Sequence, residues 1–266
     1  MKKVLTIAGS DTSGGAGLAA DLKTFEELET YGMSAITLIV TQDVNSWSHR
    51  SHLLATEVVE AQLETVFAGI GVDAAKTGML PSEDIIILVA DKVRHYAIPN
   101  LVVDPVMVCK GTNEVVNPLA VSCMSEQLVP LATVVTPNLF EASQLSGMAP
   151  LKNIDDLKEA ARKICDGGAK SVFITGGTRL SDTVAIDLFY DGTDFDVLEL
   201  PLIKTTYNHG AGCTTSAAIA AYLAKGFSTR EAVILAKEFV TKAIGNGEKL
   251  NKFVGIVKPW ANRNHS

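Results

Sequence analysis

Hydrophobic and polar residues follow two periods along the chain, and together they predict an α/β fold. Five short runs are dense in Val, Ile, Leu or Thr, which is typical of strands buried on both faces of a parallel sheet. These runs are Val4–Ala8, Ala35–Thr41, Leu101–Asp104, Thr133–Thr136 and Ser171–Thr175. Between them, apolar residues recur at helical spacing, as at Leu18, Leu22 and Phe25. This alternation predicts βαβ units, with helices on both faces of a mostly parallel sheet.

The C-terminal half departs from this alternation in two places. An Asp191-Gly192 turn separates two alternating runs, which predicts an antiparallel hairpin at one edge of the sheet. Two consecutive helices are then expected, over Gly212–Lys225 and Ser228–Asn246. The second of them begins with the capping-box spacing of Ser228 and Glu231.

Composition adds charge and length to this picture. The 266 residues carry 23 Lys+Arg against 30 Asp+Glu, a formal net charge of −7. This acidic balance argues against non-specific binding of nucleic acid, which needs concentrated Lys and Arg. No apolar run approaches the ~18 residues of a membrane span, and the first residues predict a strand instead of a signal peptide. We therefore expect one domain over residues 1–266 that acts on a small molecule in the cytoplasm, without a nucleic-acid or membrane partner.

Four glycines occur in the nine residues Gly9–Gly17, after the first predicted strand. Glycines permit positive φ and a close approach of ligand to backbone, and open α/β sheets bind ligands at the carboxyl ends of their strands. A plain strand-to-helix connection is the alternative. The pattern Gly15-x-Gly17-x-x-Ala20 also matches a dinucleotide fingerprint, but it begins too far beyond the strand end near Ala8, which argues against a nicotinamide oxidoreductase.

A second glycine motif, Asn208–Ser216, leads into a helix of small residues. Gly210, Ala211 and Gly212 stand at the helix start, where unpaired N–H groups and the helix dipole form an anion site suited to a transferred phosphoryl group. Cys213 follows at the same N-terminus, where thiol pKa values are commonly lowered, so a thiolate base is expected. A small buried cysteine is the alternative.

The remaining cysteines suggest no disulfide framework. Four cysteines in a chain of this length are too sparse for one, and none forms a C-x-x-C pair. They are Cys109, Cys123, Cys165 and Cys213. Cys123 and Cys165 lie in mixed helical stretches, where packing in the core is the expected role.

Acidic side chains follow two of the predicted strands. Asp104 ends one strand, and Glu141 follows the next within a Thr-Pro-Asn-Leu-Phe-Glu segment. Carboxylates from adjacent strand ends suit a Mg²⁺–nucleotide site, although each alone is equally typical of a helix cap or first turn. Thr175–Thr178 ends a further strand with two glycines and two hydroxyls, as expected of a contact to nucleotide phosphates.

Six motifs that span almost the whole chain resemble the ribokinase-like superfamily, specifically its vitamin kinase branch. They are Ala8-Gly-Ser-Asp-Thr-Ser-Gly-Gly-Ala-Gly, Ala19-Ala-Asp-Leu-Lys-Thr-Phe, Lys76-Thr-Gly-Met-Leu, Val103-Asp-Pro-Val-Met, Thr136-Pro-Asn-Leu-Phe-Glu-Ala and His209-Gly-Ala-Gly-Cys-Thr. The branch contains hydroxymethylpyrimidine/phosphomethylpyrimidine kinases and a pyridoxal kinase group. Cys109 together with Cys213 resembles the dual-cysteine pyridoxal kinases. The resemblance implies a three-layer α/β/α fold, with a mostly parallel central sheet and an antiparallel edge hairpin.

The resemblance also implies roles for individual residues. Cys213 would be the catalytic base, and Gly210, Ala211 and Gly212 would form the anion hole. ATP would contact Asn138, Glu141, Thr175, Gly176, Gly177, Thr178, Arg179, Gly212 and Lys237. Mg²⁺ and phosphates would be ordered by Asp104, with Glu141 as the second acid. The vitamin pocket would be lined by Asp11, Gln42, His49, Met79, Val106 and Cys109, the last on a mobile lid.

The expected activity is ATP-dependent phosphorylation of the hydroxymethyl group of pyridoxal, pyridoxine or pyridoxamine, by a homodimer. Two residues depart from the pattern. Gln42 is the glutamine of the pyrimidine kinases, where dual-cysteine pyridoxal kinases often have methionine, so a hydroxymethylpyrimidine kinase stays the alternative. Thr175 replaces a lysine of many members of the branch. A non-catalytic vitamin-binding protein is a third possibility, and the segment Ser46–Ser51 is either a substrate flap or a polar loop.

Overall fold

The computed structural model describes residues 1–107 and 118–263, and Cys109 lies outside these residues. One nine-stranded sheet runs through the described chain in the order β3-β2-β1-β4-β5-β6-β7-β8-β9. Its strands are β1 (Lys3–Asp11), β2 (Tyr31–Gln42), β3 (His49–Leu53), β4 (Ala74–Thr77), β5 (Leu101–Val103), β6 (Val134–Val135), β7 (Val172–Thr175), β8 (Val184–Tyr190) and β9 (Phe195–Pro201). Neighbours from β2 through β7 pair in parallel, whereas β3, β8 and β9 pair antiparallel at the two edges.

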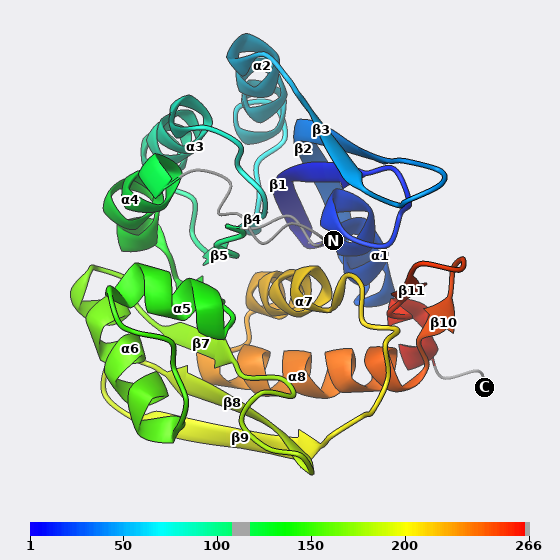
Figure 1. Ribbon diagram of the computed structural model, residues 1–266. Coiled ribbons are helices and arrows are strands. Elements are labelled where there is room, and N and C mark those ends of the chain that lie inside the picture. The colour runs from blue at the N-terminus through cyan, green and yellow to red at the C-terminus, as the bar shows by residue number, and fades with distance from the viewer. Residues whose placement is uncertain (108–117, 264–266) are drawn as a thin grey trace.

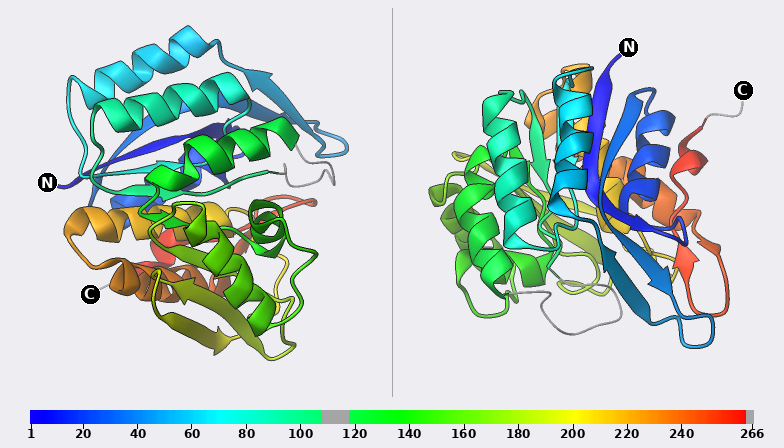
Figure 2. Two further views of the ribbon diagram at one scale, coloured as in Figure 1. Left: turned by 90° about the vertical axis from the view of Figure 1, so that its left-hand side faces the viewer. Right: turned by 90° about the horizontal axis from the view of Figure 1, so that it is seen from above.

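Helices cover both faces of this sheet. They are α1 (Gly17–Glu27), α2 (Thr56–Phe67), α3 (Glu83–His95), α4 (Pro118–Gln127), α5 (Leu139–Ser146), α6 (Ile154–Asp166), α7 (Ala211–Lys225) and α8 (Thr229–Gly245). Figure 1 shows α2 to α6 along one side of the molecule and α1, α7 and α8 on the other, and Figure 2 shows the same layers from two further directions. The core is split accordingly, with one apolar cluster beneath α2 to α6 and another beneath α1, α7 and α8. The expected three-layer α/β/α architecture is confirmed.

Several local predictions are also confirmed. The Asp191-Gly192 turn connects β8 to β9, and Tyr190 pairs with Phe195 across it. The two C-terminal helices form as α7 and α8, and at the start of α8 Ser228 and Glu231 make both hydrogen bonds of a capping box. A short antiparallel pair, β10 (Glu248–Lys249) with β11 (Gly255–Ile256), follows them. Short 3₁₀ turns occur at Val129–Leu131 and Pro259–Asn262.

Two strands of the nine-stranded sheet were not predicted from the pattern. β4 lies at the centre of the sheet between β1 and β5, but its sequence Ala-Ala-Lys-Thr contains a charge and only one β-branched residue. β3 is a polar edge strand that pairs antiparallel with β2, so the end of the segment expected as a flap or polar loop is extended backbone. Hydrophobic density therefore predicted the apolar strands. It missed β4, whose lysine pairs with a residue of α1, and β3, whose side chains are largely exposed.

Long apolar helices of the kind that cross a bilayer do not occur among residues 1–107 and 118–263.

Candidate active site

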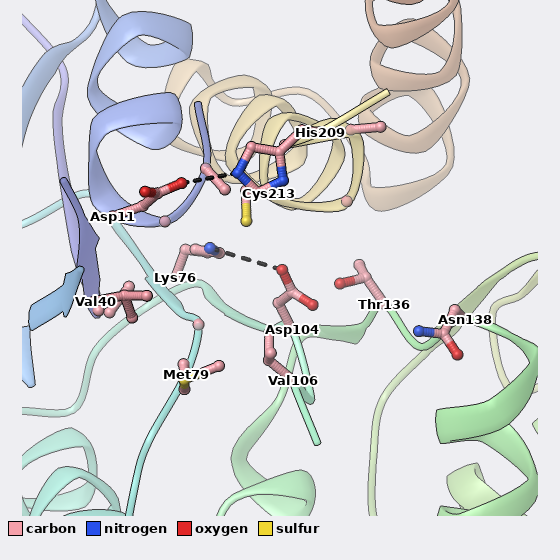
Figure 3. Close-up of a pocket in the computed structure, with 18 of the residues that line it drawn as sticks. Asp11, Val40, Lys76, Met79, Asp104, Val106, Thr136, Asn138, His209 and Cys213 are labelled. Atoms are coloured by element: carbon pink, nitrogen blue, oxygen red, sulfur yellow. Dashed lines mark hydrogen bonds and ion pairs between the residues drawn. The ribbon is translucent and has the colours of Figure 1, made fainter. Parts of the chain in front are cut away.

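Two pockets lie at the carboxyl edge of the parallel strands, and they share part of their walls. The first, of about 300 Å³, is surrounded by the ends of β1, β2, β4 and β5 and by the start of α7 (Figure 3). The second, of about 400 Å³, lies between the end of β7, β8, α7 and α8. Five residues line both pockets: Asn138, Thr175, Asn208, Ala211 and Gly212. A ligand in one pocket can therefore meet a ligand in the other at the N-terminus of α7.

Asp11, at the end of β1, is a hydrogen-bonding centre of the first pocket. Its carboxylate accepts from the backbone N–H and hydroxyl of Ser13 at 2.8 and 2.9 Å, and from Gln42 Nε2 and His209 Nε2 at 2.8 Å each. Burial alone would raise the pKa of Asp11, but these donors outweigh it and lower the pKa to about 2. Asp11 is thus an ionised carboxylate that ties β2 to the loop before α7, as the dashed line to His209 in Figure 3 shows.

The loop before α7 requires glycine at position 210. Gly210 has φ +87°, and a Cβ there would lie 2.0 Å from the Gly15 carbonyl oxygen. Ala211 donates its N–H to the Asn208 carbonyl at 3.2 Å, so its amide is already used. By helix geometry the amides of Gly212 and Cys213, the next residues of the first turn, have no intrahelical acceptor. Within the anion site expected over Gly210–Gly212, the Gly212 amide is thus without an intrahelical acceptor, and the Cys213 amide lies next to it.

Cys213 lies in the wall of the first pocket, but the expected lowering of its pKa is wrong for this structure. Burial raises the pKa of the thiol to about 12, and the carboxylates of Asp21 and Asp104 act in the same direction. The ammonium of Lys76 and a hydrogen bond from the Gly17 amide oppose this rise without cancelling it. The sequence-based expectation considered only the helix N-terminus, whereas burial among carboxylates has the larger effect.

Lys76 is a buried charge at the floor of the first pocket. Its Nζ donates to both carboxylate oxygens of Asp21, at 3.1 and 3.0 Å, and lies 3.7 Å from Asp104 Oδ2. Burial would lower the pKa of Lys76, but the charge of Asp21 outweighs it and holds the pKa above its usual value. Asp104 also accepts from the Ser216 hydroxyl at 2.9 Å. Lys76 is therefore a permanent cation between two acids.

The two acids expected to order Mg²⁺ both border the first pocket. Burial, and after it the charge of Asp104, raise the pKa of Glu141 to about 8. Glu141 also caps α5, because its carboxylate accepts from the Asn138 N–H at 2.9 Å. The helix-cap role of Glu141 is thus confirmed, and the residue also borders the pocket where its metal-binding role is expected. Among the described residues no group of three or more His, Cys, Asp or Glu side chains is arranged to hold a metal by itself. Two acidic side chains that border the same pocket nevertheless fit Mg²⁺, which commonly takes one or two carboxylates and completes its shell with phosphates and water.

The second pocket collects the residues expected to bind nucleotide. Asn138, the Thr175–Arg179 turn, Gly212 and Lys237 line it, while Glu141 lies at the first pocket only. Asp187 holds this wall together, because it accepts from the Gly176 amide at 2.9 Å and from Lys237 Nζ at 2.7 Å. The Lys237 ammonium is thus paired within the protein, and through Asp187 it stabilises the Thr175–Arg179 turn.

The residues expected to contact the vitamin come together in the first pocket. Gln42, His49, Met79 and Val106 line it with Asp11, while Cys109 lies outside the described residues. Trp47, in the loop before β3, stacks on Phe253 with ring centroids 5.9 Å apart, so this loop packs against the β10–β11 connection. The pocket wall at His49 is therefore braced from the C-terminal part of the chain.

Sequence reasoning assigned no role to three residues of the site, namely Lys76, His209 and Asp187. A lysine within the Ala-Ala-Lys-Thr run was the available signal for Lys76, because a charge inside a buried strand needs a partner. His209 and Asp187 offered no such signal. Their importance follows from partners 198 and 50 residues away in the chain, Asp11 and Lys237.

Known proteins resemble this chain over nearly its full length. The profile of the family described as phosphomethylpyrimidine kinase matches residues 11–258. A pyridoxine kinase from Bacillus subtilis is 56% identical over 99% of this chain and 97% of that protein. The structure of the pyridoxal kinase from Staphylococcus aureus in complex with AMP-PCP and pyridoxal superposes with a TM-score of 0.93 at 53% identity, over 99% of this chain and 96% of that one. A hydroxymethylpyrimidine/phosphomethylpyrimidine kinase from Bacillus subtilis is 42% identical over 92% of this chain and 89% of that protein.

Proposed function

The chain belongs to the phosphomethylpyrimidine kinase family, and we propose that it is a pyridoxal kinase, which transfers the γ-phosphoryl group of ATP to the hydroxymethyl group of pyridoxal, pyridoxine or pyridoxamine. The observation that carries this proposal is the pair of pockets that meet at the N-terminus of α7. Phosphoryl transfer needs a donor and an acceptor held in line, with charge stabilisation between them. Hydroxymethylpyrimidine phosphorylation is the second candidate, since Gln42 and the 42% identical relative support it.

ATP occupies the second pocket in this proposal, and the vitamin occupies the first. The turn Thr175–Arg179 and Asn138 contact the nucleotide, and Thr175 supplies a hydroxyl where many relatives of the branch have a lysine. The γ-phosphoryl group lies at the shared wall, where the amides of Gly212 and Cys213 stabilise its negative charge. Mg²⁺, when bound, neutralises phosphate charge, and Asp104 with Glu141 are the residues that would hold it.

Cys213 is the proposed base. The vitamin hydroxyl gives its proton to the Cys213 sulfur while its oxygen bonds to the γ-phosphorus, and the bond from phosphorus to ADP breaks. With the thiol pKa at about 12 in the ligand-free protein, the sulfur is protonated at neutral pH. Its ionisation therefore has to accompany ligand binding, so that the thiol proton leaves to solvent before the hydroxyl proton is taken up.

Asp11 positions the vitamin side of the site. Because its carboxylate is filled by donors from Ser13, Gln42 and His209, it orients the Gln42 amide and the His209 ring instead of leaving its own oxygens to a ligand. Met79 and Val106 supply apolar surface for a heteroaromatic ring. Cys109, outside the described residues, would capture the aldehyde of pyridoxal as a reversible hemithioacetal.

A coupled assay of ADP release tests the proposal with four acceptors: pyridoxal, pyridoxine, pyridoxamine and hydroxymethylpyrimidine. We expect kcat/KM to be highest for a vitamin B6 form. Turnover confined to hydroxymethylpyrimidine would assign the chain to the second candidate function. Absence of ATP turnover with all four acceptors would instead support a non-catalytic vitamin-binding protein.

A homodimer and a cytoplasmic location are further parts of the proposal. Light scattering after size-exclusion chromatography is expected to give twice the mass of one 28.2 kDa chain. A measured mass of one chain at micromolar concentration would contradict the proposed dimer.

A further inference from the structure

A lysine lies inside the central strand of the sheet, directly under the first pocket. Lys76 is completely buried, and its neighbours along β4 show which way it points. Ala74 belongs to the apolar cluster beneath α1 and α7, and Ala75 to the cluster on the other face. Because side chains alternate along a strand, Lys76 shares the face of Ala74 and points toward α1 and α7.

The Lys76 ammonium is anchored more tightly on the side away from the pocket than on the pocket side. Asp21, on α1, is also completely buried and holds Nζ through both oxygens at 3.1 and 3.0 Å. Thr6 donates to Asp21 Oδ2 at 2.6 Å and so fixes the carboxylate in turn. Asp104, which borders the pocket, is farther from Nζ at 3.7 Å. Asp21 does not line either pocket, so it does not contact a ligand bound there.

This arrangement places a fixed positive charge next to the proposed base. Figure 3 shows the Cys213 sulfur pointing toward the space between Lys76 and Asp104. The charged groups that act on the thiol are Lys76 from β4, Asp21 from α1 and Asp104 beyond β5, and the Asp11–His209 pair lines the same pocket. Lys76 is the cation that most favours the thiolate, whereas both acids disfavour it.

Fold stability alone gives a weak reason for these charges. The desolvation of two buried ions roughly offsets their attraction, and replacing a buried pair by neutral side chains of similar volume is often neutral or stabilising. Charges placed beneath a pocket, however, provide electrostatic stabilisation that needs no reorganisation during the reaction.

We propose that the buried Lys76 ammonium, which is paired with Asp21 and lies beside Asp104 and Cys213, stabilises by its positive charge the Cys213 thiolate that receives the substrate proton. The inference rests on the proposed role of Cys213. The thiol proton leaves to solvent, the thiolate takes the hydroxyl proton as the oxygen bonds to phosphorus, and that proton is released after the products leave. Lys76 itself stays protonated throughout and does not contact the transferred group.

The test compares two variants that are expected to change the stability of the Cys213 thiolate in opposite directions. Asp21→Asn with Lys76→Met removes one charge of each sign, so the net charge of the cluster is unchanged while the cation is lost. We expect this double variant to fold. Its kcat should fall about tenfold or more, because a rise of one unit in the thiol pKa leaves about tenfold less thiolate. Its KM for pyridoxal should be nearly unchanged. Alkylation of Cys213 by iodoacetamide, followed on its peptide by mass spectrometry at one alkaline pH, should slow by a similar factor.

Asp21→Asn alone has the opposite effect on the thiol. It removes a carboxylate that disfavours the thiolate and leaves the Lys76 ammonium beside Asp104, so alkylation of Cys213 should become faster than in the wild type. Thr24→Ala is the matched control, because Thr24 is also completely buried on α1 but its hydroxyl donates to the Ala20 carbonyl, away from Lys76. This control should leave the alkylation rate unchanged.

Two results would overturn the inference. One is a folded double variant with wild-type kcat and an unchanged alkylation rate, which would make the pair structural only. The other, decisive even where the double variant does not fold, is an Asp21→Asn variant whose alkylation rate equals that of Thr24→Ala. If the wild-type protein turned over no vitamin, the proposed function would fail, but the alkylation rates would still decide whether Lys76 acts on Cys213.

Discussion

Gly210→Ala is expected to damage activity far more than a left-handed glycine replaced elsewhere on the same helix. Gly210 precedes α7 with φ +87°, so alanine there bears a backbone cost of roughly 1–2 kcal/mol. Its Cβ would also lie 2.0 Å from the Gly15 carbonyl oxygen, and a separation of 3.0 Å requires a relative shift of at least 1.0 Å. Either the segment Asn208–Cys213, which includes the start of α7, or the loop that contains Gly15 has to move, and both border the first pocket.

A shift of this size acts on the amides proposed to stabilise the γ-phosphoryl group. Displacement of reacting groups by about 1 Å can cost roughly 10²-fold in rate. We therefore expect Gly210→Ala to lower kcat by about that factor in the coupled assay of ADP release. Urea denaturation should show a loss of stability above the backbone cost alone, since the contact adds to it.

Gly226→Ala separates the backbone cost of alanine at positive φ from the displacement of the active-site amides. Gly226 ends α7 with φ +95°, and nothing lies within 4 Å of the position of its Cβ. This variant should lose about 1–2 kcal/mol of unfolding free energy and keep the wild-type kcat. Equal kcat values for the two alanine variants would refute the argument that the contact with Gly15 sets the active geometry.

Further predictions concern single groups of the site. Gly212→Ala meets no atom within 4 Å, so it should stabilise the fold by about 0.5 kcal/mol and yet lower kcat/KM for ATP by filling the shared wall. Cys213→Ala should lower kcat about 10²-fold or more, and a near-normal kcat would remove it as the base. The ionised Asp11 carboxylate has a pKa of about 2 in the folded protein. It stabilises the fold fully at pH values above the pKa that Asp11 has in the unfolded chain. About 2 kcal/mol should thus be lost as pH falls from about 5 toward 2, and urea titrations of Asp11→Asn should show a flatter profile. Cys109→Ala should change kinetics with pyridoxal but not with pyridoxine, and equal effects on both would exclude the aldehyde adduct.

Local pattern predicted much of the fold because it depends on near neighbours in the chain. The five dense runs formed β1, β2, β5, β6 and β7, since short apolar runs of this kind are most stable inside a sheet that helices cover. The hairpin turn at Asp191-Gly192 and the capping box at Ser228 formed for similarly local reasons. The pattern missed β4 because the burial of Lys76 depends on Asp21, which is 55 residues away.

The sequence by itself determined the layered α/β fold and the segments that surround the site, because periodicity and glycine motifs are local properties. Only the tertiary structure decided the electrostatics there. The spacing of Cys213 at a helix N-terminus indicated a lowered pKa, yet burial beside Asp21 and Asp104 raises it to about 12. A pKa reflects the summed charge and desolvation from all neighbours, and these come from α1, from β4 and from the residue that follows β5. The chain reveals which groups carry the chemistry, and the fold determines their protonation.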